Sequence, residues 1–124
     1  MAIEERLEQV TVEAGADLTA SANLFKCVKL DTNGRAVVCS AITDITYGIL
    51  QDLAPINKAV PVAVGGIVKA KAGGTIAAGA PVATKADGTL QTAATTQYVI
   101  GVARWGGVSG DIISVQLQPA VLKA

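Results

Sequence analysis

Short runs of β-branched and aliphatic residues, most of them ended by a glycine-containing turn, follow one another along most of this chain of 124 residues. Runs of this length with turn residues between them are typical of strands in a β-sandwich or β-barrel. The pattern predicts an all-β fold without a long amphipathic helix. Turns are expected at Asn33-Gly34, Gly65-Gly66, Gly73-Gly74, Asp87-Gly88 and Gly106-Gly107. Strands are expected at Phe25–Leu30, Arg35–Cys39, Tyr47–Gln51, Val60–Val64, Ile67–Lys71, Val82–Lys85, Thr89–Thr92, Tyr98–Ala103 and Ile112–Gln118.

The order of these pieces is repeated along the chain, over approximately 23–64 and 79–118. Each copy has a hairpin with an Asx-Gly turn, then an apolar strand that contains glycine, then a β-branched strand. One copy alone would leave a sheet face uncovered, so the two copies are expected to pack on each other. We therefore expect a single β domain over 21–124, built as a small pseudo-symmetric β-barrel or sandwich of two similar halves.

The composition is apolar but poor in large side chains. Hydrophobic residues make up 51% of the chain and aromatic residues only 3%, while charged residues make up 16%. A disordered chain would show the opposite balance. Because small side chains fill little volume, the core is expected to be thin. So much apolar surface on one small domain also indicates that a partner covers part of it.

The first twenty residues differ from the rest and are expected to form an extended N-terminal arm, 1–20. Residues 1–17 carry five acidic residues and one arginine, a net charge of −4, so the remainder carries +4 because the total is zero. We consider two interpretations, a solvated tail and an arm that becomes ordered on a basic surface of a partner. On the second, deletion of 1–17 should leave the barrel folded. The candidate interface residues of the arm are Glu4, Glu5, Leu7, Glu8 and Val10.

No targeting or membrane-spanning segment is recognised. The amino terminus is acidic and lacks the apolar region of a signal peptide. The longest apolar stretch, 59–68, is far shorter than the roughly 20 residues of a membrane-spanning helix. We expect a soluble protein that is made in a cytoplasm and has no membrane partner.

The two cysteines, Cys27 and Cys39, flank the turn at Asn33-Gly34. If those two residues form a type I′ hairpin turn, Val28 lies opposite Cys39. This register places the cysteines on opposite faces of the hairpin, where they cannot form a disulfide. We therefore expect two free structural thiols, as in a reducing compartment, with a disulfide as the alternative.

Catalytic and ligand-binding patterns are not found. The chain has no histidine, which is the commonest general base and metal ligand. The cysteines lack the spacing of a zinc site, and the glycine-rich pieces lack the lysine of a phosphate-binding loop. Basic residues are scattered singly, whereas nucleic-acid binding requires clusters of them. We expect no enzyme activity, no metal, no cofactor and no nucleic-acid partner.

Trp105 is the only tryptophan and follows Arg104 at the end of an expected strand. It could plug one end of the barrel, or it could anchor a contact between subunits together with Arg104, since both residue types are enriched at interface hot spots. Pro61 lies within an expected strand and cannot donate to a central ladder, so it indicates an edge strand or a bulge.

Several of these pieces together resemble the small head-decoration, or capsid-cement, proteins of tailed bacteriophages, over about residues 22 to 118. The pieces are Val64-Gly65-Gly66-Ile67-Val68, Ala78-Gly79-Ala80-Pro81-Val82, Lys85-Ala86-Asp87-Gly88, Ile100-Gly101-Val102-Ala103 and Gly110-Asp111-Ile112-Ile113-Ser114-Val115-Gln116-Leu117. They contain no catalytic residues, so no residue-level motif is carried over.

The resemblance implies a structural protein of the virion that binds the outside of an expanded capsid and stabilises it. It implies the major capsid protein as partner and a homo-oligomer, with a trimer favoured. It also implies that an N-terminal arm can become ordered on the capsid, as it does in some proteins of this family. The alternative function is a ligand- or glycan-binding β module of a virion or cell surface, although sugar sites usually have more aromatic residues than this chain offers.

Overall fold

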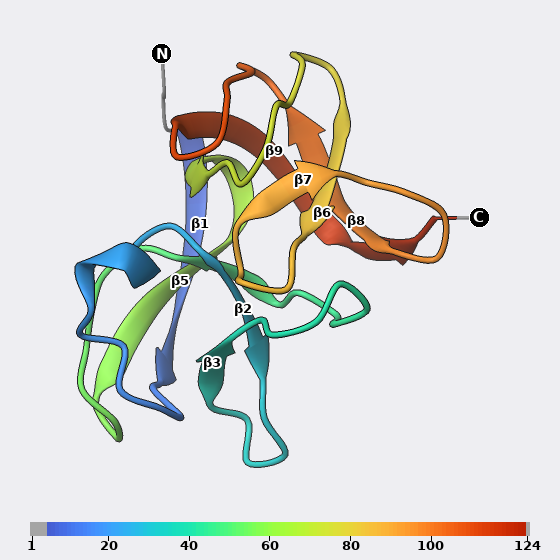
Figure 1. The fold of residues 1–124 in the computed structure, drawn as a ribbon. Coiled ribbons are helices and arrows are strands. Elements are labelled where there is room, and N and C mark those ends of the chain that lie inside the picture. The colour runs from blue at the N-terminus through green and yellow to red at the C-terminus, as the bar shows by residue number, and fades with distance from the viewer. Residues whose placement is uncertain (1–4, 124) are drawn as a thin grey trace.

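The predicted all-β fold is confirmed, and the strands join one sheet. The computed structural model describes the backbone of residues 5–123 and the side chains from residue 8 onward. Nine strands lie within this part of the chain and belong to a single antiparallel sheet (Figure 1). They are β1 (Glu5–Glu13), β2 (Cys27–Leu30), β3 (Ala36–Val38), β4 (Gly48–Leu50), β5 (Ala59–Lys71), β6 (Pro81–Thr84), β7 (Leu90–Thr92), β8 (Tyr98–Ala103) and β9 (Ile112–Leu122), with one short 3-10 helix, η1 (Ser21–Asn23).

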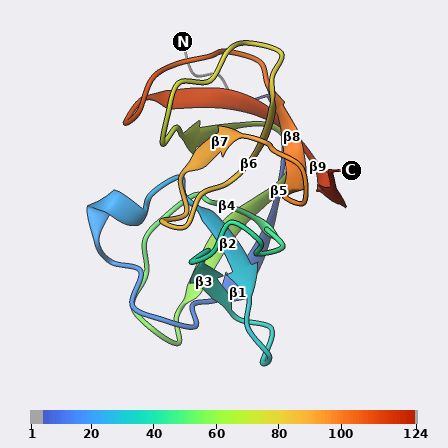
Figure 2. The same ribbon diagram turned by 45° about the vertical axis from the view of Figure 1, so that its right-hand side comes forward.

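The sheet consists of two similar halves, as expected. Its strand order is β3-β2-β4-β5 followed by β9-β8-β6-β7, so the second half repeats the first in reverse. The pairing also repeats, since Val28 on β2 lies opposite Gly48 and Val82 on β6 lies opposite Gly101. The sheet is curled into a half-barrel, with β8 and β9 arched above β2, β3 and β4 (Figure 2).

The hairpin between β2 and β3 differs in register from the expected one. Asp31 and Arg35 close it, because the N–H of Asp31 donates to the carbonyl of Arg35 over 2.8 Å. The loop therefore holds one residue more than a type I′ turn, and Gly34 takes its left-handed position at φ 76°. Val28 lies opposite Val38, not Cys39. Since a shift of one residue reverses every side chain, the prediction that the cysteines lie on opposite faces was wrong.

The expected turn at Gly65-Gly66 is not formed, because β5 runs through it. The first part of β5 pairs with β4, and Gly66 begins the part that pairs with β9. Gly66 has a φ of 84°, which glycine tolerates, so the strand bends here without ending. Pro61 lies in this same strand, between β1 and β4, and its carbonyl accepts from the N–H of Gln51. The nitrogen of Pro61, which has no hydrogen to donate, lies on the same side as this carbonyl and thus faces the region just beyond the end of β4.

Two hydrophobic clusters form the core, one on each side of the strands of the first half. Successive residues of β2 and β4 enter different clusters, so β4 is buried on both faces. The central cluster joins both halves and includes Cys27, Cys39, Ile49, Ala63, Val68, Ala70, Ala72, Ile76, Val82, Leu90, Ile100, Ala103, Ile113 and Val115. The lateral cluster belongs to the first half and includes Ala14, Leu18, Val28, Ala36, Leu50, Ala54, Val60 and Val62.

The N-terminal segment is extended, as expected, but it is also packed into the domain. β1 pairs with β5 along nearly its whole length. Beyond β1, Ala14 and Leu18 are buried in the lateral cluster, with 0% and 2% of their surface exposed. Deletion of residues 1–17 would remove β1 and Ala14 and uncover this cluster. We therefore expect this deletion to destabilise the fold, whereas the sequence suggested that the barrel would stay folded without residues 1–17.

No helix within residues 5–123 is long and apolar enough to span a membrane.

Candidate interaction surfaces

The outer edge of β1 is an open strand edge. On one side β1 pairs with β5, from Glu13 opposite Ala59 to Glu5 opposite Ile67. On the other side, no strand of residues 5–123 pairs with it. Half of its backbone N–H and C=O groups thus point away from the sheet, where a further strand or a complementary surface could meet them.

The acidic residues expected at an interface are found partly along this edge. Glu8 is exposed and folds over Gly65, where an added Cβ would lie 3.1 Å from the Glu8 carboxyl carbon. Val10 is half-buried and packs against the lateral cluster, so its side chain points to the core and holds β1 against it. Glu5 and Leu7 are located only by their backbone in β1, and Glu4 lies outside the described residues.

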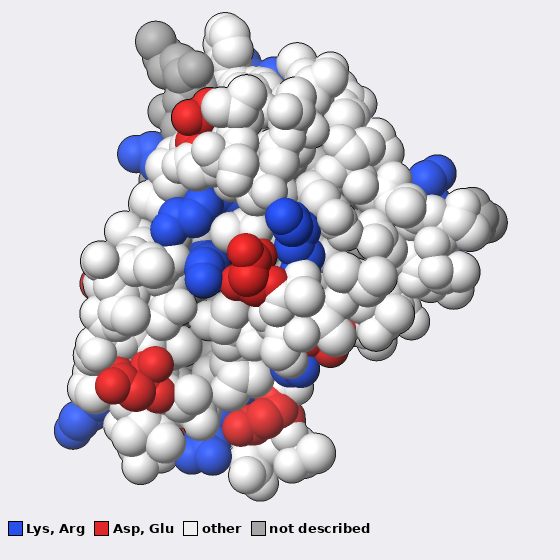
Figure 3. All heavy atoms as spheres, viewed as in Figure 1, with Lys and Arg blue, Asp and Glu red and all other residues white. Residues whose placement is uncertain are grey.

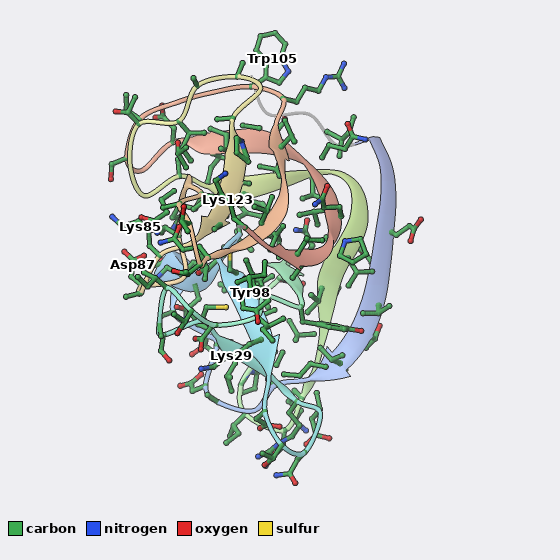
Figure 4. All side chains as sticks on the ribbon, turned by 90° about the vertical axis from the view of Figure 1, so that its right-hand side faces the viewer. Lys29, Lys85, Asp87, Tyr98, Trp105 and Lys123 are labelled. Atoms are coloured by element: carbon green, nitrogen blue, oxygen red, sulfur yellow. The ribbon has the colours of Figure 1, made fainter. Side chains whose placement is uncertain are left out.

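Trp105 follows β8 and is exposed, with 43% of its surface accessible, so it does not plug the barrel. Figure 4 shows its ring projecting from one end of the molecule. The backbone N–H groups of Arg104 and Trp105 both donate to the carbonyl of Ser114 on β9, over 2.8 and 3.3 Å. Val108, further along the same loop, is also exposed.

The start of β1 and the Arg104–Trp105 loop lie toward the same end of the sheet. Ile67 on β5 is opposite both Glu5 on β1 and Gln116 on β9. Gln116 is two residues from Ser114, which holds the loop. Figure 1 shows the first residues of β1 and the loop before β9 at its upper end. The two groups of residues that the sequence suggested separately thus lie toward the same end of the sheet, with β5 and β9 between them.

An apolar groove of about 590 Å³ lies where the segment before β4 faces the end of β9. Sequence reasoning missed it. The lining residues that could have indicated it are Ile45 and Tyr47, two large apolar residues in a connecting segment. Its lining suits apolar contact rather than acid–base chemistry. The lining consists of Leu30, Ile45, Thr46, Tyr47, Val64, Pro119 and Ala120.

Figure 3 shows basic side chains on both sides of an acidic group near the centre of one face. The pKa of Asp87 is lowered, chiefly by the hydrogen bond from the Thr89 hydroxyl and also by nearby Lys85 and Lys26. Lys85 and Lys71 donate to backbone carbonyls, those of Gly73 and Ala22, each over 2.8 Å. These lysines therefore serve to fix loops. Within the described residues, no three Cys, Asp or Glu side chains are arranged to hold a metal ion.

The chain is similar to a family of known proteins and to solved structures. No curated protein sequence matches the chain. The fold is similar to that in the crystal structure of the N base of head fiber gp8.5 in bacteriophage phi29, with a TM-score of 0.67 and 14% sequence identity. The alignment covers 95% of this chain and 99% of that one, so the two share the whole fold.

The family model described as "Phage cement protein" matches residues 9–115, which include all the strands from β2 to β8 and most of β1. This agrees with the resemblance seen in the sequence and with the absence of a catalytic pattern. The chain therefore belongs to the phage cement protein family, and its role is that of a structural protein that binds the phage capsid.

Proposed function

We propose that the protein attaches to the outer surface of the expanded capsid through the major capsid protein and stabilises the shell there. Family membership supports the capsid as partner. The observation that supports a particular attachment face is that the acidic start of β1, with its open edge, and the exposed loop of Trp105 lie toward the same end of the sheet. We call these two features together the attachment end.

Charge favours a basic partner at the edge of β1. Every glutamate of the chain lies in residues 1–13, and Glu8 and Glu13 are exposed. If two copies of β1 paired antiparallel about Gln9, Glu5 of each copy would lie opposite Glu13 of the other. Like charges directly opposite each other are destabilising, so the edge is poorly suited to pairing with itself. A strand or surface of the capsid that carries Lys or Arg would fit it better.

Trp105 is suited to anchor the contact. A tryptophan at a protein interface contributes a large apolar area, and its removal often costs tenfold or more in affinity. Here the ring is exposed, and so are the nearby side chains of Val102 and Val108. Arg104 beside it would add hydrogen bonds to acidic or carbonyl groups of the partner.

We further propose that the protein acts as a homo-oligomer, with a trimer favoured. Large apolar side chains are exposed away from the attachment end as well, among them Ile45, Ile56 and Val121. Contact between copies would cover part of this surface. Several linked attachment ends would also increase the strength of binding without new contacts. The mass of the protein in solution, measured by light scattering, tests this part separately.

Co-sedimentation with capsids tests the attachment. The purified protein is mixed with expanded shells that lack it and with precursor shells of the same phage. We expect binding to expanded shells, weakened about tenfold or more by Trp105→Ala and clearly weakened by Glu8→Lys. The matched controls are Ile56→Ala and Asp52→Lys, which change an exposed apolar and an exposed acidic residue away from the attachment end.

Equal binding to both kinds of shell would contradict the preference for the expanded form. Binding that is insensitive to Trp105→Ala and Glu8→Lys would contradict the attachment end. Thermal unfolding of each variant shows whether a loss of binding comes from a loss of fold.

A further inference from the structure

We propose that Cys27 and Cys39 are a site for an internal disulfide bond, which forms by exchange with a small disulfide such as oxidised glutathione. The two residues are free and buried in the structure. The bond would join β2 to the edge strand β3.

The pairing of β2 and β3 places the two cysteines side by side. The ladder runs through Val28 opposite Val38, and one step further it brings Cys27 opposite Cys39. The N–H of Cys39 donates to the carbonyl of Cys27 over 3.0 Å, as at a hydrogen-bonded position of the ladder, while the N–H of Cys27 donates to the carbonyl of Gly88 over 2.7 Å. The Cα atoms of such a pair are about 5.5 Å apart. That separation lies within the range of about 4.4–6.8 Å found in disulfides.

Both side chains also point to the same side of the hairpin. Residues directly opposite each other in an antiparallel pair share a face. In agreement, Cys27 and Cys39 both belong to the central cluster, whereas Val28, the next residue of β2, belongs to the lateral one. The Sγ atom of Cys39 lies 3.6 Å from the hydroxyl oxygen of Thr46.

Access to the thiols requires β3 to open. Cys27 and Cys39 are 0% and 1% exposed, and burial raises the pKa of both thiols, so little thiolate exists in the closed state. β3 is a three-residue strand at one end of the sheet order, and on its other side it has only the bridge of Ala36 to Ala14. Short edge strands open locally at a lower cost than the whole fold. Exchange would take place in this open state.

The reaction has two steps. The thiolate of one cysteine attacks one sulfur of oxidised glutathione, the S–S bond of glutathione breaks, and the departing glutathione thiolate takes up a proton. The thiolate of the other cysteine then attacks the protein sulfur of the mixed disulfide and releases the second glutathione. Two protein thiols are oxidised to one disulfide, and one oxidised glutathione is reduced to two thiols.

The bond is expected to be easily reduced. The Cβ atoms of opposed residues are about 4.5–5.5 Å apart, whereas a disulfide holds them at about 3.8 Å. The two strands must therefore approach each other, and strained disulfides are the more readily reduced ones. On the proposed function, the thiols would stay reduced in the host cytoplasm, and the bond would form on virions outside the cell.

Mass spectrometry of the protein after incubation with oxidised glutathione tests the proposal. We expect the intact mass to fall by two hydrogen atoms, with the bridge mapped to Cys27 and Cys39 by digestion without reductant. Mild urea should speed the reaction because it favours opening. The melting temperature should rise by about 5 °C and return on reduction. Cys27→Ser and Cys39→Ser should each stop at a glutathione adduct or stay unmodified.

Thiols that remain reduced even after unfolding and refolding with oxidised glutathione would overturn the proposal. Disulfides that join two chains, in place of the internal bridge, would overturn it too. The wild-type measurement decides the matter on its own if a serine variant folds poorly. Capsid attachment is measured in a different experiment, so either proposal can fail without the other.

Discussion

Gly48 and Gly101 occupy equivalent places in the two halves and make the same close approach. A Cβ on Gly48 would lie 2.3 Å from the carbonyl oxygen of Ala63 on β5, and a Cβ on Gly101 would lie 2.2 Å from that of Gln116 on β9. Each glycine therefore lets its own strand approach the longest strand of its half closely, β4 approaching β5 and β8 approaching β9. The repeat in the sequence thus corresponds to a repeated backbone contact.

Alanine at either glycine is expected to destabilise the fold. The atom that a Cβ would meet is a backbone oxygen, which cannot move without disturbing a strand. Gly48→Ala and Gly101→Ala should each lower the free energy of unfolding in urea by about 1–3 kcal/mol. The control is Gly74→Ala, where a Cβ would meet nothing within 4 Å, and the change should stay within about 0.5 kcal/mol. Equal stability of the three variants would refute the close approach.

The lateral cluster can be tested through Leu18. This side chain is 2% exposed and comes from the N-terminal segment. Leu18→Ala leaves a cavity and should lower the free energy of unfolding by about 2–5 kcal/mol. Leu122→Ala removes the same atoms from a side chain that is 55% exposed, so its effect should be small. If both variants unfold at the wild-type urea concentration, the segment is not part of the core.

The two faces of β1 should respond differently to a charge. Val12 is half-buried against the lateral cluster, and its neighbour Thr11 is exposed. Val12→Glu should lower the free energy of unfolding by about 1–3 kcal/mol, because it brings a carboxylate against apolar side chains. Thr11→Glu should have little effect. Circular dichroism during thermal unfolding measures both, and an equal response would argue against β1 as a packed strand.

Asp87 should make the fold sensitive to acid. The hydrogen bond from the Thr89 hydroxyl, with the N–H of Thr89 and nearby lysines, holds the folded-state pKa of Asp87 below its unfolded value of about 3.9. Folding thus favours the charged form. This stabilisation is present above about pH 5 and is lost as the pH falls through the folded-state pKa. Asp31 and Asp44, whose pKa values are also lowered, should act in the same direction.

Urea unfolding at pH 7 and pH 3 measures this dependence. Asp87→Asn should lower stability at pH 7 and reduce the difference between the two pH values. Asp52→Asn is the matched control at an exposed position. A variant Asp87→Asn with the full wild-type pH difference would show that the stabilising charge lies elsewhere.

Local patterns in the sequence were sufficient for the fold class and for most strands. The glycines at Gly34 and Gly88 marked both hairpin loops, since each takes a positive φ there. The repeated order of strands indicated two similar halves, and the lack of catalytic patterns agreed with a structural protein. Trp105 was identified as a candidate anchor from its residue type alone.

Register, strand continuity and exposure were decided by tertiary structure. Alternation of polar and apolar residues cannot fix the register of β2, because Cys27 and Val28 are both buried, in different clusters. Gly65-Gly66 resembles a turn locally, but pairing with β9 carries β5 through it. The alternation of polar and apolar residues along one strand is a local property. Whether one or both faces of that strand are buried depends on segments far away in the chain. For that reason the sequence determined that this protein is an all-β cement protein, and only the tertiary structure decided that its N-terminal segment is a strand of the sheet with an open edge.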